Sequence, residues 1–168
     1  MGTANTKSTI VTNGDATPND MTPAYISHGR LREQIGVVEV AAADDNDSVY
    51  RFCRVWSGWR ISQVDYANDA ITSGAAYELG VHQTAENGGA EVDADEFASS
   101  LDLTSAHAWT EVTFEASATQ FSDCEKRLWE RLGLTEDPNR WYDITMTATT
   151  VGTAAGTIGV RVRYVDGT

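Results

Sequence analysis

The feature that most constrains the fold is the strict alternation of apolar and polar residues in the last two segments of the chain. The apolar positions of these segments are Tyr142, Ile144, Met146, Ala148, Ile158, Val160, Val162 and Tyr164. Successive side chains of a β-strand point to opposite faces, so a period of two predicts one buried and one solvated face. Such a pattern is typical of antiparallel strands.

Shorter extended segments precede these two, and turn-forming residues separate them. Strands are predicted near residues 35–40, 49–56, 59–66, 75–84, 97–103 and 110–116. Ser57-Gly58 is interpreted as a β-hairpin turn, and Asn87-Gly88-Gly89 as a second turn. About eight short strands without a strand–helix rhythm predict an antiparallel, jelly-roll-like β-sandwich over residues 31–168.

One segment interrupts the period of two and predicts a short helix over about 123–132. Ser122 and Glu125 have the spacing of a capping box, and Gly133 supplies a stop. The apolar residues expected on one helical face are Cys124, Leu128, Trp129 and Leu132.

The first 30 residues are small and polar and show no periodicity. They cannot bury enough surface to offset the entropy of ordering, so we expect an extended, flexible arm. Two alternatives are open: a disordered tail, or an arm that orders on a partner. In the second case the contacts would come from the scattered apolar residues Ile10, Val11, Met21 and Tyr25.

The charge balance limits the expected partners. Twelve basic and 25 acidic residues give a formal net charge of −13. Such a surface repels phosphate and anionic lipid, so neither nucleic acid nor membrane is an expected partner. The acidity serves either solubility or complementarity to a basic protein surface. No secretion signal and no spanning run of about 18 apolar residues is seen, so we expect a cytoplasmic site of synthesis.

Residues that could carry chemistry are scattered. The three histidines lie far apart, and we interpret the acidic runs at 44–47 and 91–96 as solvated turns rather than calcium loops. Cys53 and Cys124 fall on apolar phases and are expected to be reduced core thiols. We therefore expect no enzymatic activity, no cofactor and no metal, although a pair of carboxylates for glycoside hydrolysis is a minor alternative.

Several aromatic and basic residues are candidate contact residues. Trp56 and Trp59 flank a predicted turn, where they either stack on a sugar ring or pack as core or subunit contacts. Trp109 lies on the polar phase of its segment and is a candidate interface anchor. Arg161 and Arg163 share the outward face of the last strand and pair either within the chain or with a neighbouring subunit.

Taken together, the chain resembles a family of small proteins encoded in the head modules of tailed bacteriophages. The resemblance covers most of residues 31–165. The segments that carry it are YRFCRV (50–55) to Ile61-Ser62, NDAITSG (68–74), NGGAEVDADEFA (87–98), EKRLWERLGL (125–134) and YDITMTATT (142–150) to Tyr164.

The resemblance implies a capsid decoration, or cement, protein. Such a protein is a β-sandwich, often trimeric, that binds the outer surface of the major capsid protein lattice and stabilises the head. We accordingly expect a homotrimer on the virion, made in the cytoplasm of the host bacterium. The alternative is a carbohydrate- or host-surface-binding module of a head fibre or tail appendage.

Overall fold

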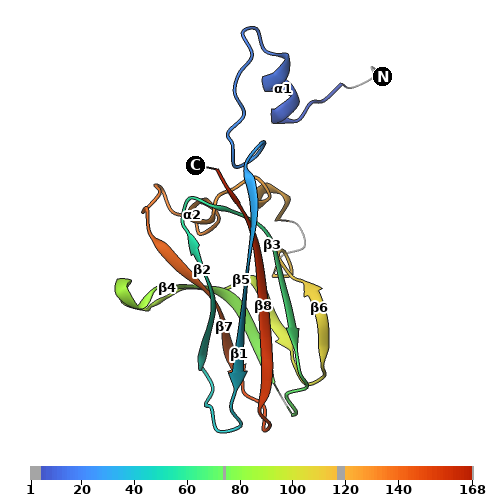
Figure 1. Cartoon of the computed structure of the whole chain (residues 1–168), viewed down its shortest axis with the longest axis vertical. Coiled ribbons are helices and arrows are strands. Elements are labelled where there is room, and N and C mark those ends of the chain that lie inside the picture. Colours follow the sequence, from blue (N-terminus) through green and yellow to red (C-terminus); the bar gives the residue numbers. More distant parts are fainter. Residues whose placement is uncertain (1–4, 74, 117–119, 168) are drawn as a thin grey trace.

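The computed structural model describes residues 5–73, 75–116 and 120–167, and β-strands dominate it (Figure 1). The strands are β1 (Arg30–Val40), β2 (Val49–Trp56), β3 (Arg60–Asn68), β4 (Ala76–Gln83), β5 (Glu91–Asp102), β6 (His107–Glu111), β7 (Trp141–Thr150) and β8 (Gly156–Asp166). The helical segments are α1 (Thr9–Asp15), η1 (Ala85–Asn87), η2 (Gln120–Asp123) and α2 (Leu128–Arg131).

The strands form two four-stranded antiparallel sheets, with orders β1-β8-β3-β6 and β2-β7-β4-β5. Consecutive strands lie in different sheets except for β4 and β5, which pair through η1. Eight strands shared in this way between two facing sheets constitute a jelly roll. The predicted mainly β, jelly-roll-like sandwich is therefore confirmed.

The turn at Ser57-Gly58 was predicted to join a hairpin, and this prediction is wrong. The turn itself forms, since the Trp59 amide donates to the Trp56 carbonyl at 3.1 Å. However, β2 and β3 belong to opposite sheets, so the turn crosses from one layer to the other. Local turn chemistry fixes the reversal of the chain but not which strand becomes the partner.

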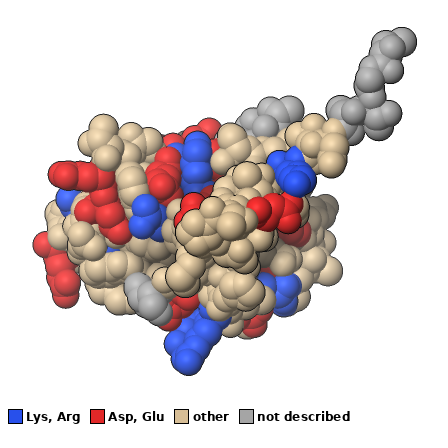
Figure 2. Space-filling model, turned by 90° about the horizontal axis from the view of Figure 1, so that it is seen from above, with Lys and Arg blue, Asp and Glu red and all other residues tan. Residues whose placement is uncertain are grey.

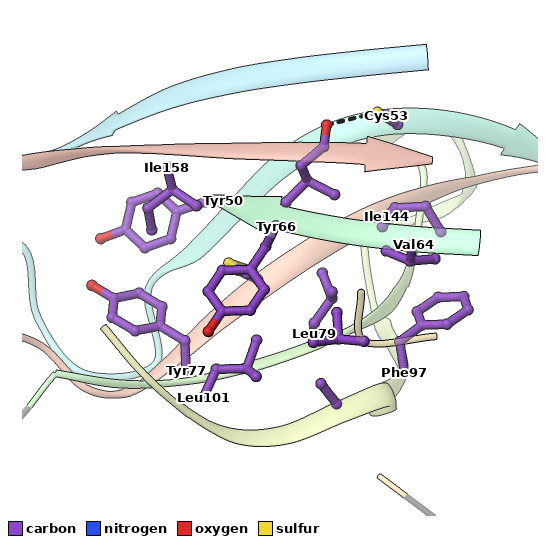
Figure 3. Packing of buried hydrophobic residues seen from close by; sticks show 14 of the residues in the cluster. Tyr50, Cys53, Val64, Tyr66, Tyr77, Leu79, Phe97, Leu101, Ile144 and Ile158 are labelled. Carbon is purple, nitrogen blue, oxygen red and sulfur yellow. Dashed lines mark hydrogen bonds between the residues drawn. The ribbon is translucent and has the colours of Figure 1, made fainter. Parts of the chain in front are cut away.

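The core lies between the inner faces of the sheets, where the alternating residues of the central strands meet (Figure 3). Tyr77 and Leu79 of β4 are fully buried against Ile158 of β8 and their neighbours, as the alternation predicts. Burying one such side chain stabilises the fold by about 1.5–3 kcal/mol. The packing of the two inner faces therefore holds the layers together.

The second face of β7 was predicted to be solvated, but it is buried. Asp143 accepts hydrogen bonds from Arg51 (2.9 Å) and Arg54 (2.8 Å) of β2. Thr145 is buried beside His82 of β4, whose Nδ1 lies 2.8 Å from its hydroxyl. Neighbouring strands thus cover these polar groups and satisfy their hydrogen bonds, which a pattern along one strand does not reveal.

The predicted helix over 123–132 is shorter and begins later, with η2 separate from α2. The capping interaction joins the Arg127 amide to the Glu130 carboxylate at 2.8 Å, not Ser122 to Glu125. The first free amides of α2, those of Leu128 and Trp129, donate to carbonyls of the turn between the sheets. This turn therefore sets where α2 begins.

The acidic run at 91–96 was predicted to be a turn, but it lies on β5. Glu96 forms an ion pair with Arg131 of α2 at 2.6 Å, and the Arg131 side chain is completely buried. The guanidinium lies between the rings of Phe97 and Phe114, at 4.9 and 5.2 Å from their centroids. The ion pair thus joins α2 to β5.

The acidic run at 44–47 forms the connection between β1 and β2, as the predicted turn requires. The Asp44 carboxylate accepts a hydrogen bond from the Ala41 amide there.

Replacing Arg131 by Met is expected to lower the free energy of unfolding by about 3–5 kcal/mol, because it leaves the Glu96 carboxylate buried without its partner. Urea denaturation followed by circular dichroism measures the change. The control is Lys126→Gln, which removes a pair with Asp123 in which the lysine is 42% exposed, and it should change stability by less than about 1 kcal/mol. Equal effects of the two substitutions would contradict the assigned role of Arg131.

The Glu78 and Asp93 carboxyls are expected to contribute stability that grows as the pH falls, whereas His82 contributes with the opposite sign, because burial lowers the pKa of its imidazole. Burial, together with nearby Asp95 and Glu91, raises the pKa of the Glu78 carboxyl, and burial and Asp95 raise the pKa of Asp93. Between the ordinary carboxyl pKa and these raised values the folded state binds more protons than the unfolded chain, so it gains stability as protons are added. Denaturation midpoints at pH 5 and pH 7 give this slope. The variant Glu78→Gln/Asp93→Asn lacks their contribution, so relative to the wild type it should lose stability as the pH falls from 7 to 5, and an unchanged slope would count against these two groups.

Candidate protein–protein interface

The outer face of the β1-β8-β3-β6 sheet carries exposed apolar side chains. On β1, Leu31, Ile35 and Val37 are 63%, 56% and 63% exposed, and Trp109 of β6 is 44% exposed. Ile35, Val37, Ala67, Gly159 and Trp109 lie side by side and form one surface, which we call the apolar face. Leu31 stands apart from it, because Glu33, which pairs with Arg163, lies between Leu31 and Ile35 on the same side of β1.

The centre of the apolar face is a shallow hollow of about 350 Å³. Val37 lies opposite Gly159, which in turn pairs with Ala67. A Cβ on Gly159 would lie 3.1 Å from the Trp109 ring, so the missing side chain leaves room for the indole to lie across the sheet. The hollow therefore has a floor of small residues with Val37 and Trp109 in its walls, and the polar residues Asn68, Asp69, His107 and Thr157 complete its lining.

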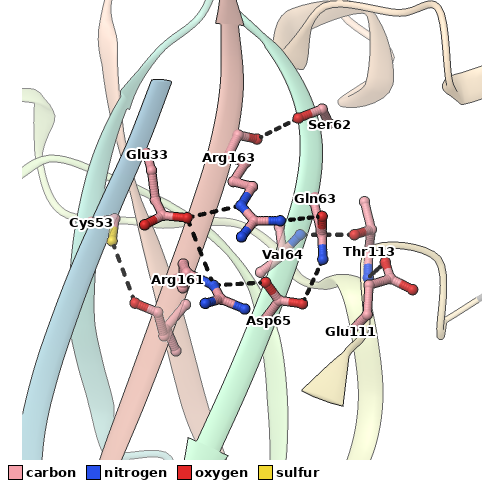
Figure 4. A network of polar contacts seen from close by, with 11 residues as sticks. Glu33, Cys53, Ser62, Gln63, Val64, Asp65, Glu111, Thr113, Arg161 and Arg163 are labelled. Atoms are coloured by element: carbon pink, nitrogen blue, oxygen red, sulfur yellow. Dashed lines mark hydrogen bonds and ion pairs between the residues drawn. The ribbon is translucent and has the colours of Figure 1, made fainter. Parts of the chain in front are cut away.

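A polar network borders one side of the apolar face (Figure 4). Arg161 donates to Asp65 at 2.9 Å, and its guanidinium lies 4.8 Å from the centroid of the Trp109 ring. Arg163 donates to Glu33 at 2.8 Å and to Gln63 at 2.9 Å. Both arginines thus pair within the chain, which is one of the two alternatives from the sequence. The network offsets two positive charges with two negative ones and fixes the indole of Trp109.

Trp56 and Trp59 pack within an aromatic cluster. Trp59 stacks on Tyr164, with ring centroids 4.1 Å apart and 7° between the planes. Trp141 meets the edges of both tryptophans, at 5.2 Å in each case. The packing alternative is therefore the one realised in this structure, and one face of the Trp59 ring is covered by Tyr164.

The segment before β1 was predicted to be extended, but it contains the short helix α1. Helix α1 lies clear of the sandwich, beyond the end where β1 begins (Figure 1). Ile10, Val11 and Met21 of this segment are exposed. Acidic and basic side chains alternate over this end of the molecule without forming a field of one sign (Figure 2).

Tyr25 joins the arm to the sandwich. Its carbonyl accepts a hydrogen bond from Arg60 at 2.7 Å, and its ring lies 5.0 Å from the Arg127 guanidinium. It also packs against Gly167 near the end of β8. Tyr25 is thus an intramolecular contact, whereas the segment before Pro23 carries the exposed apolar residues.

The residues that sequence reasoning missed are Leu31, Ile35 and Val37. The signal was present, because residues 35–40 are apolar in both phases of the strand: Ile35 and Val37 in one, Val38 and Val40 in the other. Val40 is buried and Val38 partly buried, while the other phase faces outward. A strand with two apolar phases indicates two covered faces, but not what covers the second.

Neither cysteine belongs to the apolar face, whereas His107 lines its hollow. Burial raises the pKa of Cys53 to about 11, and its thiol contacts the Val160 carbonyl at 3.8 Å, so it is an unreactive core thiol. Cys124 is only partly buried, in contrast to the prediction. In the described ranges no group of three or more His, Cys, Asp or Glu residues could hold a metal ion. No helix within the same ranges is long and apolar enough to cross a membrane.

Comparison with known proteins gives structural similarity only. No family model and no curated protein matches the chain. A chain in the capsid of Ralstonia phage GP4 superimposes with a TM-score of 0.61 at 13% identity, covering 83% of this chain and 86% of that one. A chain in the capsid asymmetric unit of cyanophage Pam1 gives a TM-score of 0.45 at 16% identity, covering 82% and 85%, too weak a likeness to support an argument. The protein thus shares its fold with a chain found in a phage capsid.

Proposed function

We propose that this protein is a virion structural protein of a tailed bacteriophage, a decoration protein bound to the outer surface of the major capsid protein lattice. The observation that carries the proposal is the apolar face, where Ile35, Val37 and Trp109 are exposed on the outer side of a sheet. Contiguous exposed apolar surface marks a site of protein association. The fold shared with a chain of the GP4 capsid and the resemblance to phage head proteins support the choice of partner.

The arm supplies a second contact region. Its exposed residues Ile10, Val11 and Met21 lie apart from the apolar face, at the end of the molecule where α1 projects. In a homotrimer, three such arms would act together and add avidity without strong individual contacts. Because Tyr25 fixes the base of each arm to the sandwich, only the preceding residues would need to order on the lattice.

A carbohydrate- or host-surface-binding module is the second candidate function. It depended on Trp56 and Trp59 as a stacking platform, yet Trp59 stacks on Tyr164 and meets Trp141 edge-on. The packing observed favours a structural role for these aromatics. We accordingly propose a non-enzymatic protein whose work is binding.

The copy number of the protein in purified particles tests the proposal. Quantitative mass spectrometry against the major capsid protein should give a ratio near one to one or another simple fraction set by the lattice. A few copies per particle would assign the protein to the neck, tail or a fibre. Absence from the particle would overturn the virion role.

Deleting residues 2–22 is expected to leave the sandwich folded. The truncated protein should bind phage heads that lack this protein about tenfold or more weakly than the full-length chain, because the arm contact is lost. Retaining Pro23 and the Tyr25 contacts protects the body from the deletion. Co-sedimentation with heads measures binding, and thermal denaturation checks the fold. The control, Ile10→Ser/Met21→Ser, should reproduce part of the loss with the arm intact. Normal binding by the truncated chain would refute a role for the arm.

A further inference from the structure

The apolar face is bordered by three exposed carboxylates. Glu39, Asp69 and Glu111 each lie two residues along the chain from a residue of the face: Val37, Ala67 and Trp109, respectively. Residues two apart along a strand point to the same side of a sheet, and the Asp69 amide continues the pairing by donating to the Thr157 carbonyl. Asp69 therefore lines the hollow itself, and Glu39 and Glu111 lie next to residues of the face on the side that a partner approaches.

These three carboxylates differ from the acidic groups of the polar network. Glu33 and Asp65 are neutralised by Arg161 and Arg163. Glu39 accepts from the Thr157 hydroxyl and Glu111 from the Thr113 amide. Within the described part of the chain, no ion pair joins Glu39, Asp69 or Glu111 to a Lys or Arg. The border thus adds three uncompensated negative charges to an apolar centre.

A second copy of this chain is a poor occupant of the face. Contact of the face with itself would bring six carboxylates together at an interface, and like charges there oppose association. The exposed arginines Arg51 and Arg54 lie on β2, in the opposite sheet of the sandwich. Docking one sheet on the opposite sheet of the next copy would stack molecules into an open chain rather than a closed ring.

We propose that the apolar face binds a segment of a different protein, one that places an apolar side chain in the hollow between Val37 and Trp109 and carries Lys or Arg on either side of it. In the virion this segment belongs to the major capsid protein, an assignment that rests on the function proposed above. The apolar centre supplies affinity, and Glu39, Asp69 and Glu111 select a basic partner. Gly159 keeps the hollow open, and Arg161 holds the Trp109 ring in place.

The first test measures affinity for heads lacking this protein, with the full-length chain throughout. Val37→Ser is expected to weaken binding about tenfold, since it removes an apolar contact from the hollow. Val49→Ser is the matched control, because Val49 is also an exposed strand valine but lies on β2 in the other sheet. Both positions are exposed, so unfolding midpoints should match the wild type. Trp109→Ala provides a second substitution in the face, and it should weaken binding at least as much.

The second test uses salt. Binding of the wild type should weaken several-fold between 50 and 300 mM NaCl, because salt screens the attraction between the carboxylates and the basic flanks. The isosteric variant Glu39→Gln/Asp69→Asn/Glu111→Gln should bind more weakly at low salt and lose most of this dependence. A variant with the same salt dependence as the wild type would overturn the basic-partner part of the inference.

The outcomes separate this inference from the proposed function. If wild type and Val37→Ser bind heads equally while the arm deletion abolishes binding, the apolar face is not the docking site but the decoration role stands. Sedimentation analysis would show a different role if Val37→Ser dissociated an oligomer and left the affinity for heads unchanged. The face would then join copies of this chain, which also overturns the inference. If the wild type fails to bind heads, the proposed function itself fails.

Discussion

The packing of the two inner sheet faces against each other is the constraint on which the rest of the structure depends. It fixes one phase of each strand toward the core, as with Tyr77 and Leu79 on β4 and Ile158 on β8. The opposite phase then faces away from the core and must either be covered by other parts of the chain or meet solvent and partners. The two sheets resolve this requirement differently, and the difference locates the candidate interface.

The outer face of the β2-β7-β4-β5 sheet is partly covered by polar side chains of the sheet itself. Asp143 and Thr145 of β7 are buried there, and Arg51, Arg54 and His82 satisfy their polar atoms. The outer face of the other sheet has a charge network on one side but leaves Ile35 and Val37 exposed. The fold therefore buries polar groups on one side, all but the Thr147 hydroxyl among Asp143, Thr145 and Thr147 having a hydrogen-bond partner within the described part of the chain, and leaves apolar surface uncovered on the other.

Alternation within single strands was enough to predict the sandwich and the inward residues of β4, β7 and β8. It did not predict which strands pair, because Ser57-Gly58 has the chemistry of a hairpin turn yet connects opposite sheets. Nor did it reveal that the acidic run at Glu96 lies on a strand, since the compensating Arg131 is 35 residues away in sequence. For the interface, Trp109 and the two arginines were identified from their outward phase. Ile35 and Val37 were missed because the apolar character of β1 in both phases suggested core.

The strong acidity and the exposed apolar face are consistent with each other. An uncovered apolar surface favours self-association, whereas a net charge of −13 makes copies repel one another. At physiological salt this repulsion is screened beyond about 8 Å, so charges right at the border of the face matter most at contact. Glu39, Asp69 and Glu111 occupy that border. In the proposed docking, the same three carboxylates would oppose a second acidic copy and favour a basic partner, which would keep the face free before assembly and select what covers it afterwards.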